Sequence, residues 1–372
     1  MARLGDIATY INGYAFKPSD WSDTGVPIIR IQDLTGNRYQ ANRYSGEYAK
    51  KYEVLPGDVL ISWSASLGVY VWTGEKAVLN QHIFKVVFDK CEVDKSFFVH
   101  QVQNILEKAA SSAHGATMKH LTKPIFDALP FYLPPLEEQR RIAVTLDKVS
   151  DLTAKRRAQL DKLDLLVNAR FVEMFGDIIL NPYGWDEDIL GSVCDVRDGT
   201  HESPQYYDAG FPLVTSKNVT GGKIDLTDCS LICETDYNKI NERSKVDIGD
   251  IIMPMIGTVG KPVIVNMEPN FAIKNVSLIK FRPNSKVLNI YILALLRSNY
   301  FDTAVLSKIR GGTQKFISLG DIRKLKILVP PIELQKEFAI LVELIQKSKL
   351  TIQQSLDKLE ILKKVLMQQY FG

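Results

Sequence analysis

An internal repeat constrains the fold of this 372-residue chain more than any other feature of its sequence. The stretch PPLEEQRRIA at 134–143 returns as PPIELQKEFA at 330–339, an offset of 330 − 134 = 196 residues. The match continues without a gap to the last residue, where Phe175-Gly176 corresponds to Phe371-Gly372. The chain is therefore organised as a duplication.

The repeated segments are predicted to be long helices. Neither glycine nor proline, the two residues that most disfavour a helix interior, stands between Pro135 and Phe175 or between Pro331 and Phe371. Apolar residues recur at helical spacing in both copies: Leu146, Val149, Leu160, Leu163 and Val167 in the first, and Ile345, Ile352, Leu356, Leu359 and Leu366 in the second. Each helix would have about 40 residues and a length of roughly 60 Å. Its apolar stripe needs a partner, for which the twin helix is the obvious candidate.

The segments that precede the two helices also repeat, with short insertions in the second copy. Three pairs of stretches align: VPIIRIQDLTGN at 26–37 with FPLVTSKNVTGG at 211–222, PGDVLISWSASLG at 56–68 with IGDIIMPMIGTVG at 248–260, and HGATMKHLT at 114–122 with RGGTQKFIS at 310–318. β-Branched runs at Val26–Ile31, Val59–Ile61 and Phe84–Phe88 predict strands, with Gly-Asp turns before some of them. The expected fold class is α+β, with two mixed α/β globules alternating with two long helices.

Composition restricts the class of protein and its compartment. With 45% hydrophobic and 24% charged residues, the chain is typical of soluble globular proteins. Because no apolar run approaches the length of a membrane span and the N-terminus lacks a secretory pattern, the cytoplasm is the expected compartment. Cys229 and Cys233 have no second pair of Cys or His nearby, so no metal site is expected. A net charge of +3 leaves nucleic-acid binding open, since the distribution of charge decides it.

Two stretches resemble catalytic or cofactor motifs without completing them. NPYGW at 181–185 is similar to the Asn-Pro-Pro-aromatic tetrad of amino-methyltransferases, but the second proline is missing and no glycine-rich cofactor loop precedes it. GTVGK at 257–261 is similar to the end of a phosphate-binding loop, but Pro262 replaces the hydroxyl residue that would hold magnesium. We therefore expect no catalytic residue, cofactor or metal.

The two globules share their frame but differ in the polar residues that they present. Turn glycines match between the copies, whereas Arg30 and Gln32 of the first correspond to Thr215 and Lys217 of the second. A duplicated scaffold that carries different polar sets predicts two related but different ligands.

Both globules carry residues suited to nucleic acid. Loops that combine glycine, threonine and lysine can bind phosphates, and Arg, Gln, Asn, Lys and His read base edges in the major groove. The DNA-binding residues predicted in the first globule are Lys17, Arg30, Gln32, Arg38, Ser62, Ser64, Ser66, Gln81, His82 and Lys119. Those predicted in the second are His201, Lys217, Asn218, Thr258, Lys261, Lys274, Asn275, Arg310, Thr313 and Lys315.

The whole chain resembles the DNA-specificity subunit of type I restriction-modification enzymes. LPPLEEQRRIA and VPPIELQKEFA are similar to the opening of the helical conserved regions of that family, and FGDIILNPYGW at 175–185 is similar to the junction that leads into its second recognition domain. LTKPIFDALPFYLPP and LGDIRKLKILVPP resemble the strand that closes each recognition domain.

The resemblance implies an order of domains and a pairing of the helices. Target recognition domains would occupy 1–133 and 181–329, with a central conserved helical region at 134–180 and a C-terminal one at 330–372. The helices would pair as an antiparallel coiled coil in a pseudo-twofold molecule. Each recognition domain would read one half of a bipartite, asymmetric DNA target.

The resemblance also implies partners. The expected partners are double-stranded DNA, two methyltransferase subunits docked on the helices, and restriction subunits bound through the methyltransferases, with no membrane. The chain itself would be a non-catalytic specificity subunit without a cofactor. The alternatives are a bivalent adaptor that holds two protein partners and a fused methyltransferase, against which the missing cofactor loop argues.

Overall fold

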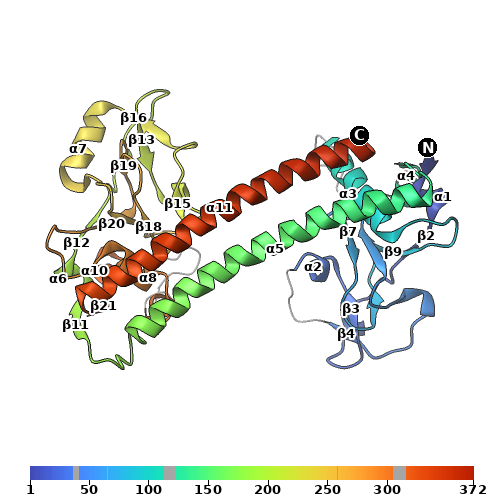
Figure 1. Ribbon diagram of the computed structural model, residues 1–372, viewed down its shortest axis with the longest axis horizontal. Coiled ribbons are helices and arrows are strands. Elements are labelled where there is room, and N and C mark those ends of the chain that lie inside the picture. The colour runs from blue at the N-terminus through green and yellow to red at the C-terminus, as the bar shows by residue number, and fades with distance from the viewer. Residues whose placement is uncertain (37–41, 65, 113–121, 258, 305–315) are drawn as a thin grey trace. The chain divides into compact units, whose positions relative to one another are not determined.

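The computed structural model describes the chain except residues 37–41, 65, 113–121, 258 and 305–315 (Figure 1). The chain falls into two compact units. Unit 1 comprises Met1–Arg157 and Gln354–Gly372, and unit 2 comprises Ala158–Gln353. Each unit contains one globule together with part of both long helices.

The two long helices are α5 (Leu136–Phe175) and α11 (Ile332–Phe371), drawn in green and red in Figure 1. Both have 40 residues, and their first and last residues differ by the offset of the sequence repeat. Glutamates in the first turn (Glu137 and Glu138 of α5, Glu333 of α11) favour the positive end of the helix dipole. The predicted helices are therefore confirmed.

The helices pack antiparallel in each unit. In unit 1, Ile142 and Leu146 of α5 share an apolar cluster with Phe371 of α11, whereas Arg157 further along α5 bonds Glu360 at 3.1 Å. In unit 2, the ring of Phe175 lies 5.4 Å from that of Phe338, whereas Asp164 bonds Lys349 at 2.7 Å. In both units the residue number rises along one helix as it falls along the other. The predicted antiparallel pairing is confirmed.

The apolar stripe predicted for the helices faces inward. Leu146, Val149, Ile345 and Leu356 are buried, with at most 6% of their surface exposed. The remaining members of the stripe are half-buried: Leu160, Leu163, Val167, Ile352, Leu359 and Leu366. Burying an aliphatic side chain contributes roughly 1.5–3 kcal/mol, so this stripe is a main source of stability for the helix pair.

In its described residues, the globule of unit 1 contains two four-stranded sheets, a further two-stranded sheet and a covering helix. One sheet is antiparallel, in the order β2 (Thr9–Asn12), β9 (Ile83–Val87), β6 (Val59–Ser62), β7 (Gly68–Val71). The other has the order β4 (Arg43–Tyr44), β3 (Val26–Ile29), β8 (Ala77–Leu79), β5 (Glu53–Val54), and in it β3 and β8 are parallel. Helix α3 (Lys95–Ser112) lies against β7. The strands predicted at 26–31, 59–61 and 84–88 are confirmed as β3, β6 and β9.

The globule of unit 2 repeats this topology. Its antiparallel sheet has the order β12 (Asp195–Asp198), β20 (Val276–Lys280), β17 (Ile251–Pro254), β18 (Val263–Ile264). A second sheet has the order β16 (Ser230–Ile232), β13 (Phe211–Val214), β19 (Ala272–Ile273), with β13 parallel to β19. The helix that corresponds to α3 is α8 (Asn289–Leu296).

Short elements complete the two globules. In unit 1 they are β1 (Ala2–Arg3), α1 (Leu4–Ile7), η1 (Pro18–Asp20), α2 (Ile31–Leu34), η2 (Lys50–Tyr52), α4 (Lys123–Asp127) and β10 (Pro130–Phe131). In unit 2 they are β11 (Asp186–Ile189), α6 (Leu190–Val193), η3 (Ser216–Asn218), β14 (Val219–Thr220), β15 (Lys223–Ile224), α7 (Glu234–Ser244), α9 (Asn299–Ala304), α10 (Leu319–Arg323) and β21 (Lys326–Val329). Helix α7 stands between β16 and β17, where unit 1 has η2 and β5 between β4 and β6.

The repeated Gly-Asp pairs form turns before equivalent strands, as predicted. The Asp58 carboxylate accepts the backbone N–H of Leu55 at 2.8 Å before β6, and that of Asp250 accepts the N–H of Asp247 at 2.8 Å before β17. Burial raises the pKa of the Asp250 carboxyl, although Lys280 lies 2.5 Å from it and opposes the shift. Both aspartates therefore have a structural role in their turns.

Candidate nucleic-acid interface

In unit 1, segments that follow or connect the central strands meet through backbone hydrogen bonds. The N–H of Gly13, just after β2, donates to the Ile83 carbonyl at 3.2 Å, and that of Gln81 donates to Tyr14 at 2.8 Å. The N–H of Trp63, after β6, donates to His82 at 3.3 Å. The N–H of Asn80 donates to the carbonyl of Ile29 at 3.2 Å, next to Arg30. These bonds define the loop cluster of unit 1, which consists of the described residues of 13–17, 30–32, 62–66 and 80–82.

Unit 2 forms the equivalent cluster with nearly the same bonds. The N–H of Gly199, after β12, donates to Val276 at 3.0 Å, and that of Asn275 donates to Thr200 at 3.2 Å. The N–H of Lys274 donates to the Val214 carbonyl at 2.9 Å, beside η3. The loop cluster of unit 2 consists of the described residues of 199–203, 215–218, 255–261 and 274–275. Predicted residues from distant parts of the sequence are thus brought together within each unit.

A glycine is required at the centre of each loop cluster. A Cβ atom on Gly13 would lie 2.0 Å from the carbonyl oxygen of Asn80, and one on Gly199 would lie 2.3 Å from that of Ile273. Both distances are far inside van der Waals contact, so the two backbone segments can approach this closely only without a side chain. The match between Gly13 and Gly199 shows that the close approach belongs to the shared scaffold.

The residue before the last central strand has a left-handed backbone in both clusters. His82 precedes β9 with φ of 72°, and Asn275 precedes β20 with φ of 55°. Such a conformation is uncommon outside glycine and is found disproportionately at functional sites. Both residues were predicted to bind DNA, and the equivalent turns present them from the same place in each globule.

His201 is the centre of a polar network in the loop cluster of unit 2. Its Nδ1 lies 2.8 Å from the side-chain oxygen of Asn275, and its Nε2 lies 2.8 Å from Asp198. Arg243 of α7 donates to the other oxygen of Asp198. Nearby, the Lys274 ammonium donates to the Ser203 hydroxyl at 2.7 Å. His201, Asn275, Asp198 and Arg243 therefore form one connected network, and Lys274 directly precedes Asn275 in the chain.

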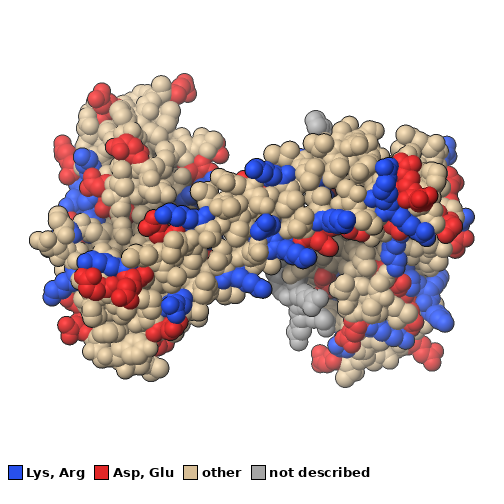
Figure 2. Space-filling view, in the orientation of Figure 1, with Lys and Arg blue, Asp and Glu red and all other residues tan. Residues whose placement is uncertain are grey.

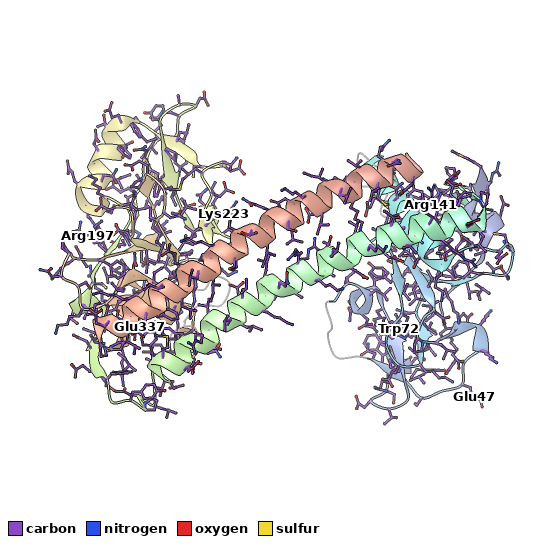
Figure 3. All side chains as sticks on the ribbon, in the orientation of Figure 1. Glu47, Trp72, Arg141, Arg197, Lys223 and Glu337 are labelled. Carbon is purple, nitrogen blue, oxygen red and sulfur yellow. The ribbon has the colours of Figure 1, made fainter. Side chains whose placement is uncertain are left out.

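Helix α7 is anchored beside this network by Arg197, which is labelled in Figure 3. Arg197 donates to the Asp195 carboxylate at 2.9 and 2.6 Å, and to the carbonyl of Arg243 at 2.9 Å. These bonds hold the pKa of the Asp195 carboxyl below its usual value. The ion pair between Arg197 and Asp195 on β12 thus positions Arg243, because Arg197 also bonds the Arg243 carbonyl.

In unit 1, Arg30 is held in place by neighbours on both sides. Its guanidinium carbon lies 4.3 Å from the centre of the Trp21 ring. With the Asn42 amide oxygen turned toward it, Arg30 donates to that oxygen through both terminal nitrogens, at 3.0 and 2.6 Å. Its Nε is buried and has no hydrogen-bond partner among the described residues. A planar cation fixed in this way is preorganised for directional hydrogen bonding.

Some predicted residues are buried. Ser62 is fully buried, and its hydroxyl donates to the carbonyl of Ser64 at 3.2 Å; Ser64 is 5% exposed. Asn218 is 3% exposed, and its side-chain oxygen accepts the Thr215 N–H at 3.0 Å, which caps η3. In this conformation the three side chains support the loops.

The other predicted residues are partly or fully open to solvent, or lie beyond the described part of the chain. Gln32 and Gln81 are half-buried, and the exposed members are Lys17, Ser66, Lys217 and Lys261. The following lie outside the described residues: Arg38, Lys119, Thr258, Arg310, Thr313 and Lys315.

Charge is mixed over the face of the molecule that Figure 2 shows. Figure 2 shows Lys and Arg side chains interspersed with Asp and Glu over the face in view, in line with the small net charge. Within the described ranges, no helix is both long enough and apolar enough to cross a membrane.

Comparison with known proteins gives the same family for both halves. The profile of the type I restriction modification DNA specificity domain matches residues 1–162 and 182–361. The specificity subunit of the type I restriction enzyme EcoBI from Escherichia coli is 26% identical over 371 residues, which cover 91% of this chain and 77% of that protein. The MjaVIII specificity subunit of Methanocaldococcus jannaschii is 24% identical over 362 residues, covering 91% of this chain and 84% of that one.

Solved structures show the same fold. The S subunit of the type I restriction-modification system from M. genitalium superposes with a TM-score of 0.56 at 15% identity, covering all of this chain and 95% of that one. A chain from a structure of type I complex assembly and conformational transition gives 0.56 at 19% identity, covering all of this chain and 96% of that one. This chain therefore belongs to the type I restriction-modification DNA specificity family, whose members are the non-catalytic specificity subunits of these enzymes.

Proposed function

We propose that the chain reads a bipartite, asymmetric DNA target, with one half-site bound by each loop cluster. The observation that carries this proposal is the combination of matched backbone bonds with unmatched side chains. On equivalent turns after β8 and β19, the matched backbone bonds place Asn80 and Gln81 of unit 1 where unit 2 has Lys274 and Asn275, and His82 is one additional residue in unit 1. Two equivalent platforms with different donors and acceptors suit two different half-sites.

The side chains of each cluster have separate roles in this proposal. Arg30, Gln81 and His82 in unit 1 and Asn275 in unit 2 read base edges, and His201 holds Asn275 in position through its ring nitrogen. The exposed ammonium groups of Lys217 and Lys261 contact phosphates, which adds affinity without sequence preference. Ser62, Ser64 and Asn218 hold the loops in position.

The paired helices set the gap between the half-sites. In dimeric DNA readers, the distance between two reading elements fixes the half-site spacing, and here α5 and α11 are the elements that both units share. Within each unit, part of the apolar stripe of the two helices is buried.

Exposed apolar residues on the helices are the docking surface for two methyltransferase subunits. Unit 1 exposes Val144, Ile361 and Leu362, with 52%, 62% and 44% of their surface open. The positions related by the repeat in unit 2 are equally exposed: Ile340, Leu165 and Leu166, at 61%, 66% and 42%. Because exposed apolar side chains that recur in this way favour protein contacts, the same docking surface occurs twice. Restriction subunits join through the methyltransferases.

The test is long-read methylation mapping of cells that produce a methyltransferase subunit of the same system with or without this chain. We expect a single bipartite motif that is methylated only when the chain is present. A bivalent adaptor without DNA specificity would leave the methylation pattern unchanged while still assembling with the methyltransferase, and that result would overturn the proposal.

A further inference from the structure

The repeated PPLEEQ and PPIELQ motifs each contain a buried glutamine. Gln139 of α5 is 2% exposed, and Gln335, the equivalent residue of α11, is fully buried. Glutamine is seldom buried, because an amide removed from water costs free energy unless its donors and acceptor find partners. Two equivalent buried amides in the first turn of the long helices therefore require an explanation beyond helix initiation.

The two amides make matching hydrogen bonds. The side-chain oxygen of Gln139 accepts the backbone N–H of Asp94 at 2.9 Å, and its nitrogen donates to the carbonyl of Pro134 at 2.8 Å. The oxygen of Gln335 accepts the N–H of Leu288 at 2.8 Å, and its nitrogen donates to the carbonyl of Pro330 at 2.8 Å. The second nitrogen donor of Gln335 also reaches the carbonyl of Lys286 at 3.0 Å.

Each amide joins the beginnings of two helices. Asp94 directly precedes α3 and Leu288 directly precedes α8, the equivalent helices of the two globules. Pro134 and Pro330 belong to the extended segment that enters α5 or α11. Gln139 therefore links the start of α5 to the start of α3, and Gln335 links the start of α11 to the start of α8. We call each of these links a glutamine clamp.

A clamp of this kind fixes the angle between the long helix and its globule more closely than apolar packing alone would. Hydrogen bonds are directional, whereas burial of apolar area is not. Because a 40-residue helix is roughly 60 Å long, a tilt of about 10° at one end moves the other end by about 10 Å. That displacement equals the length of about three base pairs at about 3.4 Å each. A small change in the angle at the clamp would therefore change the number of base pairs between the half-sites.

We infer that Gln139 and Gln335 are positioning residues that restrict the spacer between the two half-sites to one length. This inference rests on the proposed bipartite reading of DNA and adds to it the residues that hold each globule at a fixed angle to the helices. Neither glutamine touches DNA in this assignment. Each acts through the orientation of the globule to which it is bonded.

The experiment uses the full chain in complex with its methyltransferase subunit, carrying Gln139→Met or Gln335→Met. Methionine has nearly the volume of glutamine, so it keeps the packing and removes the hydrogen bonds. Methylation rates are measured on duplexes that carry both half-sites with spacers varied one base pair at a time. We expect the half-sites to stay the same. The methylation rate on duplexes with other spacer lengths, divided by the rate at the best length, should rise at least about tenfold, which corresponds to a loss of about 1.4 kcal/mol in discrimination.

Because the rate ratio is measured within one preparation, it does not depend on the fraction of folded complex. Gln139→Asn provides a milder variant if Gln139→Met lowers the yield. Gln354→Met, an exposed glutamine of α11, is the matched control and should keep the spacer preference of the wild type. An unchanged preference in both clamp variants, or equal broadening in the control, would overturn the inference. A wild-type complex without any bipartite target would instead remove the proposed function itself.

Discussion

The imidazole of His201 lies with one nitrogen 2.8 Å from Asn275 and the other 2.8 Å from Asp198, so both of its ring nitrogens are engaged within unit 2. Asn275 stands in the left-handed turn before β20, and Asp198 ends β12. The histidine therefore ties two segments of the loop cluster together and fixes the polar surface that they form.

We predict that His201→Ala changes the second half-site and leaves the first intact, because its contacts lie entirely within unit 2. Gln81→Ala, on the equivalent turn of unit 1, should change only the first. Each loss should cost about 1–3 kcal/mol at particular bases. Methylation mapping of each variant gives the result, and a change of both half-sites by either substitution would contradict separate reading.

Trp21 should govern how well Arg30 discriminates its base. A cation over an exposed aromatic ring contributes about 0.5–1 kcal/mol, so Trp21→Ala should reduce discrimination at one position of the first half-site by a few fold. Trp21→Phe retains a ring under the guanidinium and should restore most of it. Binding measured on duplexes that differ at single positions tests this, and equal weakening at every position would assign Arg30 to a phosphate.

The glycines at the centre of the loop clusters should tolerate no side chain. Gly13→Ala and Gly199→Ala place a Cβ against a backbone carbonyl, and we expect each to reduce the free energy of unfolding by about 1–3 kcal/mol or more. Gly320→Ala is the control, because its Cβ would meet nothing closer than the Ser318 hydroxyl at 3.6 Å and alanine favours the helix α10. Denaturant unfolding of the three variants distinguishes them.

Neighbouring leucines of α5 should separate stability from assembly. Leu163 is a half-buried member of the apolar stripe, so Leu163→Asp should lower stability by a few kcal/mol. Leu165 is 66% exposed, so Leu165→Asp should leave the melting temperature nearly unchanged and weaken binding of the methyltransferase. Thermal denaturation and size-exclusion chromatography with the methyltransferase provide the two measurements. If Leu165→Asp instead lowered the melting temperature and Leu163→Asp weakened methyltransferase binding, Leu165 would belong to the apolar stripe and Leu163 to the docking surface.

Lengthening both helices should lengthen the spacer. Four residues inserted after Ala158 and four after Gln354, positions related by the repeat, add about one turn or 6 Å to each helix. We expect the same half-sites with a spacer longer by one or two base pairs, at about 3.4 Å each. The methylome of the doubly inserted variant is the readout. Altered half-sites with an unchanged gap would mean that the helices do not set the spacing.

Most of the scaffold could be predicted from the sequence because its signals are local and repeated. The limits of α5 and α11 follow from the absence of glycine and proline together with apolar spacing, and the strands follow from β-branched runs. The environment of the site residues could not be predicted in this way. Arg243 reaches Asp198 from 45 residues away, so its placement has no local pattern. Asn218 instead caps η3 by bonding Thr215 only three residues earlier, so its inward placement does have a local signal. The glutamine clamps could not be predicted either, because Gln139 and Gln335 accept hydrogen bonds from residues 45 and 47 positions earlier in the chain.

The composition of unit 1 has a consequence for the order in which the chain folds during synthesis. Unit 2 is one continuous stretch, whereas unit 1 needs Gln354–Gly372 in addition to its first 157 residues. The ring of Phe371 lies 5.5 Å from that of Phe97, and Lys108 bonds the Phe371 carbonyl at 2.9 Å across 263 positions of sequence. Domains ordinarily fold from the N-terminus as they are made, and contacts over such long separations form slowly. The globule that is synthesised first is therefore completed last, once Gln354–Gly372 has been made.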